Sequence, residues 1–473
     1  MIRQASSNNK KLISMAVAAL LLSGCQSIWP DYQRPKVAVP SAYDQQVNQE
    51  NSLLSKTWWT LYQDQLLNDL VAKAMQNNSD IKLAVARIEE ADAVLREVGA
   101  ALFPQIDLNS AASRTRATTT GATPVFANNP RSNFNAQLRT SFEIDFWGKL
   151  SRTKEAARAQ ALSTRYAKDT VALSLAGLVA NNYLLLRSLD SQLLLTQVSL
   201  KSREDSLALT QRRLEGGVVS ALDVQQAEVA RENLSAQLSD LNRLRSLSQH
   251  QLALLTGDME LNIASADIKS LPIPPTPPAG LPSALLESRP DVRQAEEQMV
   301  AANANIAVAK AALYPSISLT AGFGGESKQL GDVLKSASRI WTGGLSLNLP
   351  IFDSGKLNAR VDQANAKQKQ VLASYEGVLQ NAFREVNDAL VNLRLQTERE
   401  VALNKAQLAA QKALQISENR YQSGYSAYLE VLDAQRVYND AALTFIQSRQ
   451  ARLVATVSLF KALGGGWQAS TVQ

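Results

Sequence analysis

Few side chains in this sequence could perform chemistry. The 473 residues include one cysteine, Cys25, and one histidine, His250, which excludes a cysteine or histidine metal cluster and an intrachain disulfide. A serine nucleophile would need His250 as its base, but His250 lies in a helix-like stretch with no nucleophile elbow nearby. No glycine-rich phosphate loop is present. We therefore expect no catalytic residue and no metal site.

The amino terminus explains the single cysteine. A polar, basic start is followed by an apolar run over 12–22, which is too short to span a bilayer. Such a run before small residues is typical of a secretory signal peptide. Cys25 follows Leu22-Ser23-Gly24, a sequence that resembles the bacterial lipobox, and Gln26 in place of an aspartate points to the outer membrane. We predict a lipid on Cys25; the alternative is a buried anchor with a chance cysteine.

Charge and composition exclude other classes of protein. The formal net charge is +6, but Arg3, Lys10 and Lys11 belong to the signal segment, and no basic run or aromatic-basic cluster elsewhere suggests nucleic-acid binding. Hydrophobic residues make up 45% of the chain, which argues against disorder. Aromatic residues make up only 6%, a bias that favours long helices over a large mixed core.

The sequence contains an internal duplication. Segments 101–108 and 213–217 resemble 312–319 and 420–424, in the same order and about 210 residues further along. A proline-rich run, which cannot continue a helix, lies between the copies. We expect a signal peptide (1–24), a lipidated extended segment (25–62), a first repeat (63–270), a proline-rich linker (271–282) and a second repeat (283–473).

Each repeat contains a pair of predicted strands, within about 105–146 and about 316–352. Between 133 and 146, apolar side chains alternate with polar ones, Arg139 and Glu143 among them. A soluble sandwich could show the same alternation. Its strands average five or six residues, however, whereas tilted membrane strands need about ten.

Four membrane strands cannot close a barrel alone, because open edges in lipid would leave backbone groups without hydrogen bonds. Two copies of the chain would supply eight strands, and three copies would supply twelve. An eight-stranded barrel fills with side chains, so the polar strand faces favour the wider one. We therefore expect a trimer with a continuous lumen on its axis.

Long helices follow each strand pair, over about 149–256 and about 356–463. No proline occurs from 149 to 214, and about 65 residues of helix span about 100 Å. Leucines recur here at steps of four and three, a heptad seam interrupted by polar residues such as Arg203. Extra leucines beside the seam favour a ring of helices; a two-stranded antiparallel coiled coil is the alternative.

The candidate functional residues lie where these helices turn back. Glycines at both positions permit the left-handed backbone that ends a helix and reverses the chain. The turn residues are Arg213, Gly216, Gly217 and Val218 in the first repeat and Arg420, Ser423 and Gly424 in the second. The simplest interpretation is a structural turn without a further role.

Leu429, Asp433 and Arg436 follow the second turn, four and three residues apart, on one face of the next helix. One interpretation is a solvated helix end with a local Asp433–Arg436 ion pair. The other is a gate. If this face points at a threefold axis, three leucines and three carboxylates converge on one constriction, where like charges repel unless Arg436 is their partner.

Several segments, taken in order, resemble the outer-membrane factor family of TolC-type exit ducts, in the lipoprotein branch that serves resistance-nodulation-division (RND) efflux pumps. The resemblance covers almost all of the chain after the signal peptide. The motifs are Pro30-Asp31-Tyr32-Gln33-Arg34-Pro35, Trp58-Trp59, Asp145-Phe146-Trp147-Gly148-Lys149, Arg289-Pro290-Asp291-Val292, Pro350-Ile351-Phe352-Asp353-Ser354-Gly355, Tyr428-Leu429-Glu430-Val431-Leu432-Asp433-Ala434-Gln435-Arg436 and Ala462-Leu463-Gly464-Gly465-Gly466-Trp467. One departure is Asp64-Gln65, where many relatives have Asp-Pro.

The resemblance implies an α+β membrane protein. Its homotrimer would form a 12-stranded outer-membrane barrel, with four strands per chain, continued by a long α-helical barrel in the periplasm. The protein would be the exit duct of a tripartite efflux pump, joined through a periplasmic adaptor protein to an inner-membrane RND transporter. The turn residues would face the adaptor, and Leu429, Asp433 and Arg436 would gate the aperture. The resemblance implies no cofactor besides an N-acyl diacylglyceryl lipid on Cys25, and no nucleic-acid partner.

Two other functions are consistent with the sequence. A type I secretion duct would have the same fold and a different pump, although the lipobox favours efflux. A periplasmic lipoprotein tether built of coiled coil would have no use for the strand alternation. The cargo, whether drug, solvent, metal ion or dye, is not determined by these residues.

Overall fold

The computed structural model describes residues 29, 31–35, 57–120, 129–276 and 288–467. The signal peptide, Cys25 and the end of the proline-rich linker lie outside these described residues. The chain divides into two compact units, and each takes segments from both sequence repeats. We name them the strand unit (1–36, 88–163 and 295–375) and the helix unit (37–87, 164–294 and 376–473).

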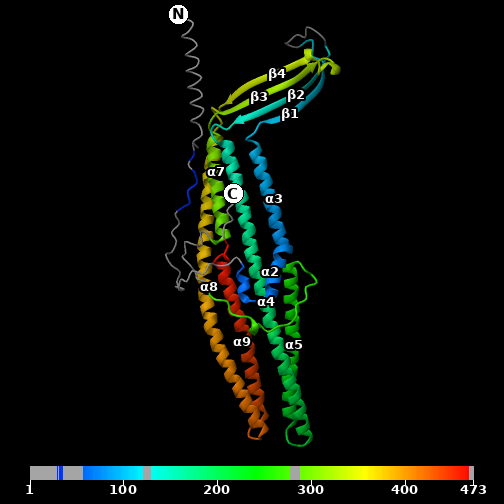
Figure 1. The fold of residues 1–473 in the computed structure, drawn as a ribbon, viewed down its shortest axis with the longest axis vertical. Coiled ribbons are helices and arrows are strands. Elements are labelled where there is room, and N and C mark those ends of the chain that lie inside the picture. The colour runs from blue at the N-terminus through cyan, green and yellow to red at the C-terminus, as the bar shows by residue number, and fades with distance from the viewer. Residues whose placement is uncertain (1–28, 30, 36–56, 121–128, 277–287, 468–473) are drawn as a thin grey trace. The chain divides into compact units, whose positions relative to one another are not determined.

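The strand unit contains one antiparallel sheet in the order β1-β2-β3-β4 (Figure 1). Its strands are β1 (Gln105–Thr115), β2 (Arg131–Ile144), β3 (Ser316–Ser327) and β4 (Arg339–Asn348). Strands of 10 to 14 residues have the length that a tilted membrane strand needs. The two repeats meet where β2 pairs with β3, so each repeat supplies one hairpin of the sheet.

The sheet has one apolar and one polar face. Leu138, Phe323 and Trp341 stand in one cross-strand row, and Asp107 and Arg139 stand opposite each other in the next row. Phe323 is 60% exposed and Trp341 is 80% exposed within the single chain. A large apolar face of this kind needs lipid or another protein surface to cover it.

Two strands end at identifiable side chains. β1 ends at Thr115, and beyond it the Asn129 side chain replaces a ladder partner: it donates to Ala117 O at 2.7 Å and accepts from Ala117 N at 2.9 Å. The second pair was expected to reach 352. β4 ends at Asn348 because Pro350, just beyond it, has no N–H to donate to a ladder.

Two helices precede the first strands, α2 (Gln65–Asn77) and α3 (Ser79–Ala100). The break lies at Asn78. Its side-chain amide donates to Leu255 O at 3.0 Å, and its side-chain oxygen accepts from Asp80 N at 2.8 Å. The break therefore depends on a contact with a residue far along the chain.

Asp64 sets the start of α2 without the proline that many relatives have at the next position. One carboxylate oxygen accepts from Leu66 N at 2.9 Å and from Leu67 N at 3.2 Å, which caps the helix. The other oxygen accepts from Tyr183 Oη. Burial and this hydrogen bond raise the pKa of Tyr183, so the phenol stays neutral.

The other helices are α4 (Lys149–Glu215), α5 (Ala221–Thr256), α7 (Pro290–Ala311), α8 (Lys356–Gln422) and α9 (Tyr428–Ala462), with short 3-10 turns η2 (Trp58–Tyr62), η3 (Ile268–Ser270), η5 (Leu330–Asp332) and η6 (Ser336–Ser338). α5 and α9 belong to the helix unit. α4 and α8, at 67 residues each, contribute to both units.

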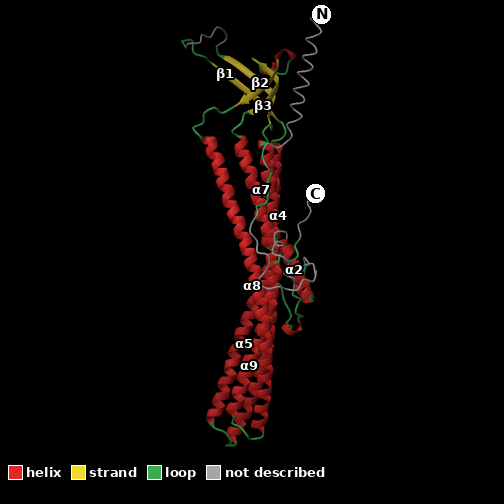
Figure 2. Ribbon diagram, turned by 90° about the vertical axis from the view of Figure 1, so that its left-hand side faces the viewer, coloured by secondary structure: helices red, strands yellow, loops and turns green. Residues whose placement is uncertain are grey.

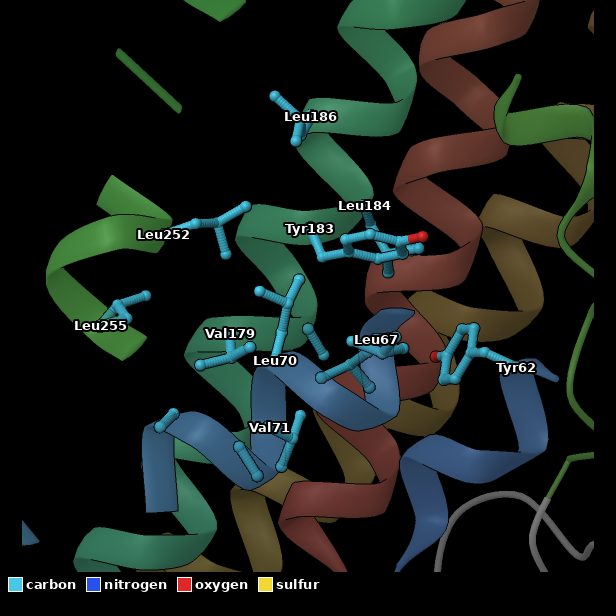
Figure 3. Packing of buried hydrophobic residues seen from close by; sticks show 14 of the residues in the cluster. Tyr62, Leu67, Leu70, Val71, Val179, Tyr183, Leu184, Leu186, Leu252 and Leu255 are labelled. Carbon is cyan, nitrogen blue, oxygen red and sulfur yellow. The ribbon is translucent and has the colours of Figure 1, made fainter. Parts of the chain in front are cut away.

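The core of the helix unit surrounds a segment of α4 (Figure 3). Leu67 and Leu70 of α2 pack with Val179 and Leu186 of α4 and with Leu252 of α5. Full burial of each such side chain contributes about 1.5–3 kcal/mol. The core thus holds α4 and α5 side by side, and these helices lead to the first turn.

Candidate functional site at the helix ends

Both long helices end in the same glycine turn. After α4, Gly217 has φ +73° and Val218 N donates to Arg213 O at 2.8 Å. A left-handed residue followed by this backbone bond satisfies carbonyl groups that a helix end leaves free. The turn after α8 repeats this geometry: Gly424 has φ +78°, and Tyr425 N donates to Arg420 O at 2.8 Å. The positive φ explains glycine at both positions.

The turn residues identified in the sequence are exposed, with one exception. Gly216, Gly217, Val218, Arg420, Ser423 and Gly424 are open to solvent. Arg213 is half-buried because its guanidinium lies over the Tyr421 ring, with Cζ 4.7 Å from the ring centroid. Tyr421 packs in turn against Tyr428, at 5.4 Å between centroids. This stack joins the end of α4 to the second turn.

Leu429, Asp433 and Arg436 share one face of α9, as their spacing predicted. Arg436 Nη2 donates to Asp433 Oδ1 at 2.8 Å, and Arg436 Nη1 lies 3.6 Å from Asp440 Oδ2. The hydrogen bond that Arg436 donates to Asp433 raises the pKa of Arg436, which stays charged. Leu429 is 60% exposed. An exposed leucine beside an exposed ion pair is a surface that could contact another chain.

These three side chains line a hollow of about 760 Å³ in the helix unit. The facing wall comes from α5, with Leu222 and Val229 among its apolar residues. α5 contacts α9, and each of these helices begins at one of the two turns (Figure 2). The structure therefore brings the three residues together on one wall of a lined space, with both hairpins contributing to it.

A buried polar link lines the same hollow, and sequence reasoning did not identify it. The Arg203 guanidinium of α4 donates to Gln435 Oε1 of α9, and Gln435 Nε2 donates to Glu418 Oε1 at 3.3 Å. Burial lowers the pKa of Arg203. The available signal was its position in the leucine seam of α4, where an apolar residue belongs.

The described residues closest in sequence to Cys25 contact the strand unit. Trp29 Nε1 donates to Trp147 O at 3.0 Å, and the Trp29 ring packs edge-on against Tyr314, at 5.9 Å. Asp31 pairs with Arg152 at 2.9 Å. These contacts lie where β2 leads into α4. Within the described part of the chain, no cluster of three or more His, Cys, Asp or Glu side chains could hold a metal ion.

The family model "Outer membrane efflux protein" matches residues 70–258 and 281–465. The chain belongs to this family. It is 34% identical to the probable efflux pump outer membrane protein TtgC of Pseudomonas putida, over 98% of this chain and 97% of that protein. It is 33% identical to the cation efflux system protein CusC of Escherichia coli, over 97% and 99%.

Solved structures of family members have the same fold as this chain. A crystal structure of CusC, 31% identical, superposes with a TM-score of 0.84 over 93% of this chain and 100% of that chain. The open state of the Neisseria gonorrhoeae MtrE outer membrane channel, 29% identical, also has a TM-score of 0.84, over 95% and 100%. Both comparisons span the strand-bearing and the helical segments of this family member.

The expected fold class is confirmed: an α+β membrane protein whose four strands per chain contribute to a trimeric 12-stranded barrel. The protein is located in the outer membrane and extends into the periplasm. It is the exit duct of a tripartite efflux pump, a passive channel and not an enzyme.

Proposed function

We propose that Leu429, Asp433 and Arg436 form the closable aperture of this duct. The observation that supports the proposal best is their arrangement: an exposed leucine and an exposed ion pair on one wall of a hollow at the start of α9. With this face toward the threefold axis, three such walls meet. Leucine contacts and paired charges then close the aperture, and weakly stabilising exposed pairs let it open.

The double variant Asp433→Ala, Arg436→Ala tests the aperture. We expect its single-channel conductance in planar bilayers to rise several-fold, because the constriction loses its paired charges. The matched control is Arg384→Ala with Asp388→Ala, an equally exposed pair on α8 at 2.9 Å. Correctly assembled trimers of the aperture variant with wild-type conductance would place the constriction elsewhere.

We further propose that the turn residues bind the periplasmic adaptor of an inner-membrane RND transporter. They are Arg213, Gly216, Gly217, Val218, Arg420, Ser423 and Gly424. Val218, an apolar side chain on a tight turn, is 73% exposed within the described part of the chain. The Arg213–Tyr421 stack ties the two turns into one surface. An adaptor bound there would contact both hairpins at once.

We also propose that Cys25 has an N-acyl diacylglyceryl lipid that anchors the chain in the outer membrane. The lipobox-like residues before Cys25 motivate this. The Trp29–Trp147 hydrogen bond supports it, because it holds Trp29, four residues after Cys25, at the junction between β2 and α4. Acyl chains at that position reach the inner leaflet of the outer membrane.

Metabolic labelling with radioactive palmitate tests the lipid. The Cys25→Ser protein is expected to lose the label, while a Ser27→Ala control retains it. Some of the variant should still reach the membrane, because the closed barrel buries more apolar surface than the acyl chains do. Palmitate incorporation into Cys25→Ser would refute this assignment.

A further inference from the structure

The apolar face of the sheet changes character toward the hairpin loops. Above the row of Phe323 and Trp341, the next residue with the same orientation on β4 is Arg339. On β1, the even-numbered residues lie on the same face as Leu108, and Arg114 is one of them. Arg116, just beyond the end of the strand, continues this alternation. All three arginines are exposed. Arginines therefore end the lipid-facing apolar band.

No acidic side chain neutralises these arginines among the described residues. The sequence from 116 to 130 includes no aspartate or glutamate. In the other hairpin, Asp332 pairs with Lys335 at 2.5 Å, and Glu326 accepts from Asn133 Nδ2 at 2.9 Å. The opposite end of this face has isoleucine and leucine instead of cations, in the row of Ile144, Ile317 and Leu347.

Closure of the barrel brings the arginines of two subunits together. β1 and β4 are the two edges of the sheet, so β4 of one chain pairs with β1 of the next (Figure 1). Opposed residues in a ladder share a face, so Arg339 must stand opposite an even-numbered residue of the partner's β1. End-to-end overlap puts it opposite Arg114 of the partner subunit. If the partner's strand is shifted by two residues in one direction, Arg339 stands opposite Arg116 of the partner subunit. A shift of two residues in the other direction leaves Arg339 diagonally adjacent to Arg114 of the partner subunit.

A cluster of like charges in this position needs a counter-ion. Directly opposed cations destabilise a ladder, and the carboxylates of the neighbouring hairpin, Glu326 and Asp332, already have other partners. Arg114 and Arg339 lie at the ends of their strands that are away from the helices, and this end is the outer side of the membrane. The anions at that depth are lipid phosphates, and guanidinium groups bind phosphate oxygens in a bidentate geometry.

We propose that each subunit junction binds a phosphate of the phosphorylated glycolipid of the outer leaflet. Arg339 of one subunit and Arg114 and Arg116 of the partner subunit hold the phosphate. The acyl chains of the lipid lie against the apolar rows below, where Trp341 marks the boundary between headgroup and hydrocarbon. The proposal rests on the trimeric barrel and is independent of the aperture and the adaptor surface.

Native mass spectrometry of the purified full-length trimer, titrated with bis-phosphorylated lipid A, tests this site. The variant is Arg114→Gln, Arg116→Gln, Arg339→Gln. The matched control is Arg131→Gln, which removes an arginine at the same level of the sheet but on the lumen face, opposite Thr115. Each spectrum also reports whether the variant is trimeric, and the single variant Arg339→Gln serves if the triple variant does not assemble.

We expect the triple variant to bind lipid A about tenfold more weakly or worse, since charge-assisted hydrogen bonds are lost, while Arg131→Gln binds as wild type. Dephosphorylated lipid A should bind the wild-type trimer as weakly as lipid A binds the triple variant. Equal lipid A affinity in wild type and variant would overturn the proposal. The proposal would also be overturned if dephosphorylated lipid A or phosphatidylglycerol bound the wild-type trimer as tightly as lipid A does. Displacement of lipid A by inorganic phosphate at a similar concentration would overturn it as well.

Discussion

The two helix turns share a glycine but differ in how the next helix begins. α5 starts with a reciprocal capping box: Asp223 N donates to Ser220 Oγ at 3.3 Å, and Ser220 N donates to Asp223 Oδ2 at 2.9 Å. α9 starts after Ala427, whose methyl side chain cannot cap a helix. The first turn is therefore anchored at both of its helices, and the second at only one.

The second turn also has unpaired polar atoms. Ser426 Oγ and Tyr421 Oη are buried without a hydrogen-bond partner among the described residues. A missing cap and unpaired buried atoms both reduce the free energy that favours the observed geometry. The hairpin that includes Leu429, Asp433 and Arg436 is thus the easier of the two to rearrange, and the α4–α5 hairpin acts as its frame.

The largest effect is expected on the free energy of unfolding, from removal of the hydrogen bond between Arg203 of α4 and Gln435 of α9. Gln435→Ala leaves the Arg203 guanidinium buried without its acceptor, which should lower the free energy of unfolding by about 2–3 kcal/mol. Thermal unfolding of the trimer, followed by circular dichroism, measures the loss. Gln422→Ala, an exposed glutamine at the end of α8, is the control. Equal melting of the two variants would show that the link does not restrain α9.

A smaller effect is expected from the second turn itself. Gly424→Val places a β-branched side chain at φ +78°, with a strain of about 1–2 kcal/mol that distorts the turn. Trimers should still form, but pull-down of the adaptor should fall. Gly377→Val, at a helical position of α8 where an added Cβ meets no atom of the chain, should leave the pull-down unchanged. Full adaptor recovery with Gly424→Val would remove this turn from the adaptor surface.

The smallest effects should come from exchanging the caps. Ser220→Ala removes a cap and should cost about 1 kcal/mol, whereas Ala427→Asp adds one and should stabilise α9 by a similar amount. If the second hairpin is the moving one, Ala427→Asp should also lower the open probability of single channels, and Ser220→Ala should not change it. The reverse pattern in bilayer recordings would exchange the roles of the two hairpins.

Local patterns in the sequence were enough to predict the strands, the long helices and the two chain reversals. The alternation from 133 to 146 predicted the apolar and polar faces that the β2 register shows. Gly216-Gly217 and Ser423-Gly424 predicted the two turns, where Gly217 and Gly424 have positive φ. These features depend on residues within a few positions of one another, so they can be recognised without a fold.

The features that needed the tertiary structure join residues far apart in the chain. The break at Asn78 depends on Leu255, and the Arg203 guanidinium has its acceptor on Gln435. The Arg213 guanidinium lies against Tyr421 because the two hairpins pack together. Spacing within one helix places a side chain on a face, but only packing decides which distant residue that face meets.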